Sequence, residues 1–196
     1  MSKTVDFYFD LSSPYAYMAS TQIDELCERH GASANWKPFL LGAVFKATGN
    51  RAPATVIPKG KYMFEDLKEW AAYYGVDFAF PSSFPLNSVK PMRACLAAEE
   101  QGKLKEFVRA MYEAYWVNNK KIDEPDIIGE VAKSVGLDAE KLLARIEEQD
   151  LKDKLKDNTQ AAVDKGAFGA PSMFVDGRMY WGNDRLPLLE RYLKQG

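Results

Sequence analysis

The chain has 196 residues, and 26 Lys and Arg against 28 Asp and Glu leave a net charge of only -2 at pH 7. This length predicts one domain, or one domain with a large insertion. This charge balance gives no electrostatic reason to expect binding to nucleic acid or to an anionic membrane. No apolar run approaches the ~20 residues that cross a bilayer, and the first residues lead into strand-like sequence instead of a signal peptide, so we expect a cytoplasmic protein without nucleic-acid or membrane partners.

The first predicted elements are a strand, a helix and a second strand. Residues 5–10 are rich in apolar side chains that alternate with polar ones, which is typical of a strand. A helix is expected next, with Ser13 as its N-cap and Pro14 as its first helical residue. Its buried stripe would be Ala19, Ile23, Leu26 and Cys27. With a second strand over 32–40, the chain opens with a βαβ pattern.

The middle of the chain is predicted to be helical. Helical patterns run over 62–75 and again over 88–165, and a loop rich in Pro and aromatic residues at 78–87 separates them. The longer stretch is interrupted at Gly102, Pro125 and Gly136.

Strand character returns near the C-terminus. Residues 172–181 predict a hairpin with its turn at 176–178, and a last helix is expected over about 184–194. Without the helical block, the order is βαβ–ββα, so we predict an α/β thioredoxin-like fold. The thioredoxin-like domain would cover about 1–60 plus 166–196, and a helical insertion domain about 61–165.

The histidine and cysteine content limits the chemistry. The single histidine, His30, excludes a His-rich metal site, and its place at the end of a predicted helix is typical of a cation near the C-terminus. Cys27 and Cys95 lie far apart among apolar helical neighbours, without a C-x-x-C pattern. This favours buried packing over redox work.

Two junctions could carry chemistry. A Ser13 hydroxyl at the start of the first helix would lie among free backbone N–H groups, where a thiolate or another anion is stabilised, although Ser before Pro is also a common N-cap. Pro171, after the small residue Ala170 at the mouth of a strand, is a candidate cis-proline whose neighbouring backbone could bind an extended peptide. An ordinary trans-proline at a strand start is the simpler interpretation.

Three further groups have equally simple alternatives. Asn183 and Asp184 could bind the ammonium and carboxylate of an amino-acid group, or Asp184 could only cap a helix. The segments 49–53 and 58–62 have the composition of a solvated loop. Aromatic residues of the middle region could form a wall or pack in the core: Tyr73, Tyr74, Trp116 and the loop from Phe80 to Phe84.

Together these motifs resemble one family over nearly the whole chain. Ser-Pro-Tyr follows Phe-Asp-Leu-Ser, and Gly-Asn-x-x-Pro, Lys-Gly-x-Tyr, Ala-Phe-Gly-x-Pro and Gly-Asn-Asp-Arg occur downstream in that order. The chain resembles 2-hydroxychromene-2-carboxylate isomerases, relatives of kappa-class glutathione transferases within the DsbA-like thioredoxin superfamily. Where thiol oxidoreductases of this superfamily have Cys-Pro-x-Cys, residues 13–16 contain no sulfur, which makes a disulfide oxidoreductase the least favoured enzyme.

The resemblance implies glutathione as the source of the missing sulfur. By analogy, Ser13 would donate a hydrogen bond to the glutathione thiolate. The other implied glutathione-binding residues are Pro14, Tyr15, Asn50, Ala170, Pro171, Asn183 and Asp184, with Lys59 or Lys61 near the glycyl carboxylate. Residues of the helical insertion would face a small aromatic second substrate, and Lys61, Tyr73, Phe84 and Trp116 are the candidates.

The implied reaction is a cis–trans isomerisation in aromatic catabolism. The thiolate adds to a conjugated carbon, the new single bond rotates, and the thiol leaves, so glutathione is not consumed. The resemblance also implies a homodimer. Two alternatives stay open: a kappa-like glutathione transferase, which leaves sulfur in its product, and a non-catalytic thioredoxin-like binding module.

Overall fold

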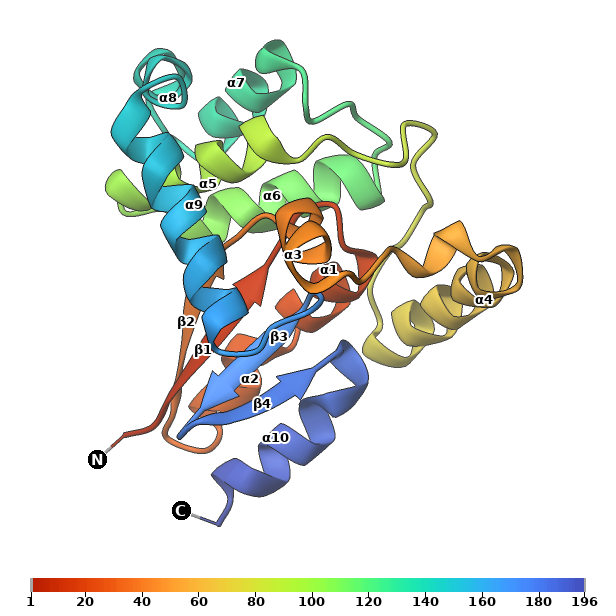
Figure 1. Cartoon of the computed structure of the whole chain (residues 1–196). Coiled ribbons are helices and arrows are strands. Elements are labelled where there is room, and N and C mark those ends of the chain that lie inside the picture. The colour runs from red at the N-terminus through yellow and green to blue at the C-terminus, as the bar shows by residue number, and fades with distance from the viewer. Residues whose placement is uncertain (1, 196) are drawn as a thin grey trace.

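The computed structural model describes residues 2–195. A mixed four-stranded sheet forms the centre of the fold (Figure 1). The strands are β1 (Thr4–Phe9), β2 (Ser33–Pro38), β3 (Ser172–Val175) and β4 (Arg178–Trp181). Their order in the sheet is β2-β1-β3-β4. Strand β1 is parallel to β2 and antiparallel to β3, and β3 and β4 form the predicted hairpin.

Helices cover both faces of this sheet and one of its ends. The N-terminal helices are α1 (Pro14–Ser20), α2 (Ile23–Glu28), α3 (Leu41–Thr48) and α4 (Ile57–Tyr74), with a 3-10 turn η1 (Pro53–Thr55). The central ones are α5 (Val89–Glu100), α6 (Leu104–Trp116), α7 (Pro125–Ser134), α8 (Ala139–Arg145) and α9 (Gln149–Asp164). The chain ends with a 3-10 turn η2 (Asn183–Arg185) and α10 (Leu186–Leu193). Within residues 2–195, no helix has the length and apolarity needed to cross a membrane.

Alternation along β1 builds a core on each side of the sheet. Phe7 lies in the larger cluster, where its ring meets Trp36 of β2 edge to face at 5.1 Å. The next residue, Tyr8, points to the other side and belongs to a smaller cluster with Val44 of α3 and Ala162 of α9. This is the period of two that a strand imposes on its side chains.

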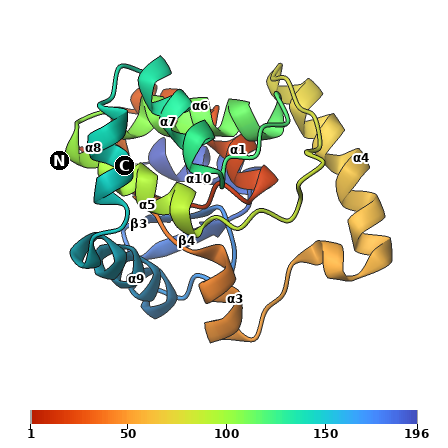
Figure 2. The same ribbon diagram turned by 90° about the horizontal axis from the view of Figure 1, so that it is seen from above.

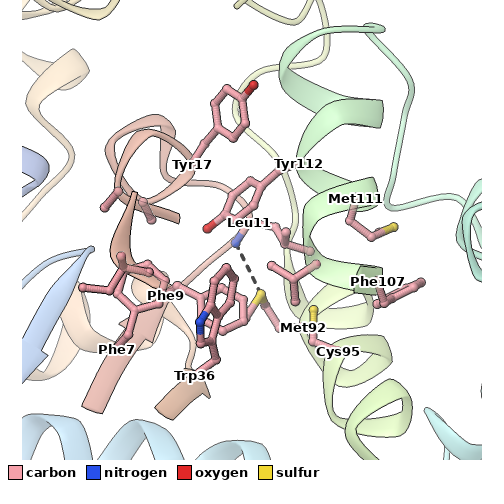
Figure 3. Close-up of a cluster of buried hydrophobic side chains, with 14 of the residues drawn as sticks. Phe7, Phe9, Leu11, Tyr17, Trp36, Met92, Cys95, Phe107, Met111 and Tyr112 are labelled. Atoms are coloured by element: carbon pink, nitrogen blue, oxygen red, sulfur yellow. Dashed lines mark hydrogen bonds between the residues drawn. The ribbon is translucent and has the colours of Figure 1, made fainter. Parts of the chain in front are cut away.

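The larger core joins the helical block to the start of the chain, as Figure 3 shows for the side chains around Trp36. The Leu11 N–H donates to the sulfur of Met92 at 3.3 Å. The Tyr112 hydroxyl donates to the Asp10 carbonyl at 3.2 Å, and Trp116 Nε1–H donates to the Leu11 carbonyl at 3.0 Å. Helices α5 and α6 therefore fix the short segment that leads from β1 into α1.

The element boundaries differ from the prediction at several places, including an unpredicted break between α8 and α9. The predicted first helix is two helices, because the chain turns after Ser20, although the predicted apolar stripe is buried in both. Helix α3 was not predicted, and Val44 is its single fully buried residue. Helix α4 begins at Ile57 instead of residue 62, with Pro58 in its first turn.

Helix α4 lies beyond α1, apart from α5–α8, in both views of the chain (Figures 1 and 2). The end of α9, by contrast, returns to the sheet at Ala162. The predicted division into a thioredoxin-like part and an insertion stays a prediction, and the larger core contains residues of both.

Candidate active site

A cleft of about 670 Å³ opens at the N-terminal end of α1, between α4 on one side and the segments around β3 and η2 on the other. Most of the predicted site residues line it: Ser13, Pro14, Tyr15, Asn50, Lys59, Phe84, Ala170, Asn183 and Asp184. Residues far apart in the sequence thus meet in one place. Because β1 and β3 are antiparallel neighbours, the C-terminal end of β1 lies beside the N-terminal end of β3.

Ser13 is buried at the base of the cleft, with 3% of its surface exposed. Its Oγ accepts the Ala16 N–H at 3.1 Å, which confirms the predicted N-cap, and donates to the Ala170 carbonyl at 3.0 Å. Among residues 2–195, the N–H groups of Tyr15 and Ala170 have no acceptor. The base of the cleft therefore combines one hydroxyl with two backbone donors that are free for a ligand.

The loop before β3 is held against the loop after α3. The peptide bond between Ala170 and Pro171 is cis, as predicted, and Pro171 is buried behind Ala170 without lining the cleft. Asn50 Nδ2 donates to the Phe168 carbonyl at 2.8 Å, while its Oδ1 accepts the Arg51 N–H at 2.9 Å. Asn50 thus joins the two loops that form one wall.

The η2 turn presents a buried amide to the cleft. Asn183 is 2% exposed, and within residues 2–195 its Nδ2 has no hydrogen-bond partner. Gly182 has a φ of 100°, and a Cβ there would collide with the Asp184 carboxylate. Asp184 lies inside η2 and pairs with Arg185, so the simple helix-cap interpretation of Asp184 is wrong.

Three residues predicted to face the second substrate lie outside the cleft. Trp116 is fully buried, with its ring centroid 6.2 Å from that of Phe84. Its Nε1–H donates to the Leu11 carbonyl, so it is not free for a ligand. Tyr73 is 75% exposed at the far end of α4, and Lys61 is exposed on the same helix, outside the residues that line the cleft. These positions are corrections to the prediction, because burial and helical phase direct their side chains elsewhere.

With this geometry in place, the comparisons decide the family. The family model of the DSBA-like thioredoxin domain matches residues 4–194. The chain belongs to this family. It is 38% identical to a 2-hydroxychromene-2-carboxylate isomerase of Sphingobium xenophagum, over 98% of this chain and 99% of that one. It is also 32% identical to glutathione S-transferase kappa 1 of Caenorhabditis elegans, over 97% and 91% of the two chains.

The solved structures agree. A structure of 2-hydroxychromene-2-carboxylate isomerase superposes with a TM-score of 0.90 at 27% identity, covering 98% of this chain and 95% of that one. The predicted family and the thioredoxin-like fold class are therefore confirmed. In this member of the DSBA-like family, Ser13 and Ala16 stand at the two positions where its disulfide-exchanging members, by the sequence resemblance, have cysteines.

One wall of the site in this DSBA-like chain was missed by sequence reasoning. Helix α4 lines the cleft with the predicted Lys59 and with four residues that were not predicted, Tyr62, Met63, Asp66 and Trp70. Their spacing of three and four residues is the signal that could have found them. The same spacing also fits an ordinary amphipathic helix, so it does not by itself indicate a ligand.

A second residue that was missed is Asp10, which is fully buried directly after β1. Its carboxylate accepts hydrogen bonds from the N–H and Oγ of Ser12 at 2.9 and 2.8 Å, from the Leu41 N–H at 2.8 Å and from Ser88 Oγ at 3.0 Å. Burial raises the pKa of Asp10 above its usual value. Asp10 joins the turn before α1 to the starts of α3 and α5, so it holds three segments around the cleft.

The remaining nucleophiles are placed away from the cleft. Cys27 and Cys95 are free thiols in the larger core. His30 Nε2 lies 3.0 Å from Glu190 of α10, a contact that lowers the pKa of Glu190. His30 therefore joins α10 to the end of α2.

We expect both thiols to be inert in the folded chain. Burial raises the pKa of Cys27 to about 12 and that of Cys95 well above its usual value, so neither forms the reactive thiolate at neutral pH. A chromogenic disulfide reagent should release no colour rapidly from native protein and two equivalents after unfolding. Rapid release of one equivalent from the native chain would contradict the burial of these residues.

Proposed function

We propose that this chain is a glutathione-dependent isomerase that acts on 2-hydroxychromene-2-carboxylate or a close aromatic analogue. The observation that carries the proposal is the base of the cleft. A buried hydroxyl, Ser13, stands there beside two free backbone N–H groups, and residues 13–16 supply no thiol. A ligand thiol can fill this place, and these donors would favour its thiolate.

The polar and charged groups along the rest of the cleft complement those of an extended, charged peptide. The free N–H of Ala170 could pair with the cysteinyl backbone of glutathione as an added strand does. The unpartnered Nδ2 of Asn183 can donate to the γ-glutamyl carboxylate, and Asp184 can accept from its ammonium group. At the other end, Arg51 and Lys59 supply positive charge for the glycyl carboxylate.

Binding would also release the Ser13 hydroxyl from its present partner. Ser13 Oγ donates to the Ala170 carbonyl in this structure. If the cysteinyl N–H of glutathione takes over that carbonyl, the serine proton becomes free to point at the sulfur. The thiolate then adds to the conjugated carbon of the ring-opened substrate, the bond rotates, and expulsion of the thiolate regenerates glutathione.

The decisive experiment is a spectrophotometric assay of chromene isomerisation with and without a catalytic amount of glutathione. We expect turnover only with glutathione, and many turnovers per glutathione molecule. A second function, that of a kappa-like glutathione transferase, is favoured by the identity with kappa 1 of Caenorhabditis elegans. Stoichiometric conjugation of a chlorodinitrobenzene electrophile, with the chromene left unchanged, would replace the isomerase by that transferase.

Three further properties belong to the same proposal. We place the reaction in the cytoplasm and in the catabolism of aromatic compounds, with the chain acting as a homodimer, and sedimentation of the purified protein tests the dimer. Calorimetry that detects no binding at millimolar glutathione would instead favour a non-catalytic binding module.

A further inference from the structure

One carboxylate in the cleft has no role in the function proposed above. Asp66 of α4 is half-buried and lines the cleft. Its Oδ2 accepts the Tyr15 hydroxyl at 2.8 Å, and its Oδ1 accepts the Tyr62 hydroxyl at 3.3 Å. Tyr15 belongs to α1 and Tyr62 to α4, so the phenols of two different helices donate hydrogen bonds to the same carboxylate.

The charge of Asp66 is not neutralised by a basic side chain. Among residues 2–195, no Lys, Arg or His nitrogen lies within ion-pair distance of Asp66. Its neighbour Glu65, by contrast, is exposed and pairs with Lys68 at 3.1 Å. A purely structural acid is normally paired when it is removed from water. Asp66 is instead held by two neutral phenols, and its side chain borders the cleft.

Tyr15 connects this acid to the reaction centre. It lies two residues after Ser13 and also lines the cleft. Burial and the adjacent Asp66 raise the pKa of Tyr15, so the phenol keeps its proton at neutral pH and donates it to Asp66. Its oxygen retains lone pairs that can accept a hydrogen bond from a ligand hydroxyl.

We propose that Tyr15 and Asp66 form a proton relay that opens the ring of the second substrate before the thiolate adds to it. This inference rests on the proposed function, because it requires a substrate that is a cyclic hemiketal. By its chemical name, 2-hydroxychromene-2-carboxylate is one: the hydroxyl and the ring oxygen share carbon 2. The conjugated carbon that a thiolate attacks becomes activated by a ketone only after the ring opens.

The relay conserves atoms and electrons. The hemiketal proton moves to the Tyr15 oxygen while the phenolic proton of Tyr15 moves to Asp66. The electron pair of the broken O–H bond forms the new carbonyl, and the bond from carbon 2 to the ring oxygen breaks with its pair on that oxygen. The proton on Asp66 then returns through Tyr15 to the ring oxygen, leaving a phenol, a ketone and a relay in its starting state.

A pair of substrates separates this role from structural support. The chromene needs ring opening, whereas cis-2-methoxybenzylidenepyruvate is already open and cannot close, because its phenolic oxygen is methylated. Wild-type protein with glutathione should isomerise both. Asp66→Asn and Tyr15→Phe should each lower turnover of the chromene, relative to turnover of the methyl ether by the same variant, by about a hundredfold or more, which is the usual scale of acid–base catalysis. Glu65→Gln is the matched control and should affect neither substrate.

Each other outcome overturns a different statement. Equal losses on both substrates would make the pair a support for α4, and unchanged rates on the chromene would remove it from the reaction; either overturns the relay. Wild-type protein inactive on both substrates would instead overturn the proposed isomerase function. Calorimetry with glutathione checks that the variants keep their site, and Tyr15→Phe alone carries the test if Asp66→Asn does not fold.

Discussion

Replacing Ser13 by alanine is expected to slow glutathione-dependent turnover by about tenfold to a hundredfold while glutathione affinity stays close to wild type. The reason is that one hydrogen bond to a charged group contributes about 1.5–3 kcal/mol, and this hydroxyl would act chiefly on the thiolate. Steady-state kinetics and calorimetry on the same preparations measure the two effects separately.

The Ser13→Ala variant also loses structural bonds, which need their own control. Ser13 caps α1 through Ala16, and losing a cap costs about 1 kcal/mol of unfolding free energy. Ser172 is fully buried and donates to the Gly169 carbonyl at 2.8 Å, yet it does not line the cleft. Ser172→Ala should therefore lower stability to a similar extent with turnover retained. A Ser13→Ala enzyme that binds glutathione and turns over at the wild-type rate would reduce Ser13 to a helix cap.

The second large effect is on stability and concerns Asp10. Asp10→Ala should lower the free energy of unfolding by about 3 kcal/mol or more, because donors from Ser12, Leu41 and Ser88 lose their shared, fully buried acceptor. Urea unfolding measures the loss. Asp6→Ala, in the strand that leads to Asp10, is the control: Asp6 is half-buried and pairs with Lys165, so its removal should cost no more than about 1 kcal/mol.

Asp10 also makes the free energy of unfolding depend on pH, in a direction that follows from its raised pKa. Burial raises the pKa of Asp10 in the folded chain, so the folded state binds this proton more tightly than the unfolded state. The resulting contribution is fully present below the ordinary aspartate pKa and is lost as the pH rises through the raised value. Asp10→Asn should remove this part of the pH dependence. If Asp10→Ala and Asp6→Ala lose the same free energy of unfolding, the prediction that Asp10 stabilises the fold through its shared hydrogen bonds is wrong.

The sequence predicted the residues at the base of the cleft better than its walls. Ser13, Ala170 and Asn183 were candidates because each stands at a junction with local meaning, a helix start or a strand mouth, whereas Asn50 came only from the family resemblance. Trp116 was kept as a candidate for the substrate pocket, although packing in the core was the default for an aromatic residue of this region. Its hydrogen bond to Leu11 decides for the core, and sequence spacing does not contain that contact.

By itself, the sequence determined the order of the strands, the cap at Ser13, the cis-proline candidate and the absence of sulfur at residues 13–16, since periodicity, turn chemistry and residue identity are local properties. Only the tertiary structure decided that α4 faces Ser13 across the cleft and that Asp10 accepts hydrogen bonds from three segments. It also decided that Asp66 accepts hydrogen bonds from two phenols. These contacts join residues that are mostly tens of positions apart. They depend on how helices pack around the sheet, and many sequences with the same local patterns could pack differently.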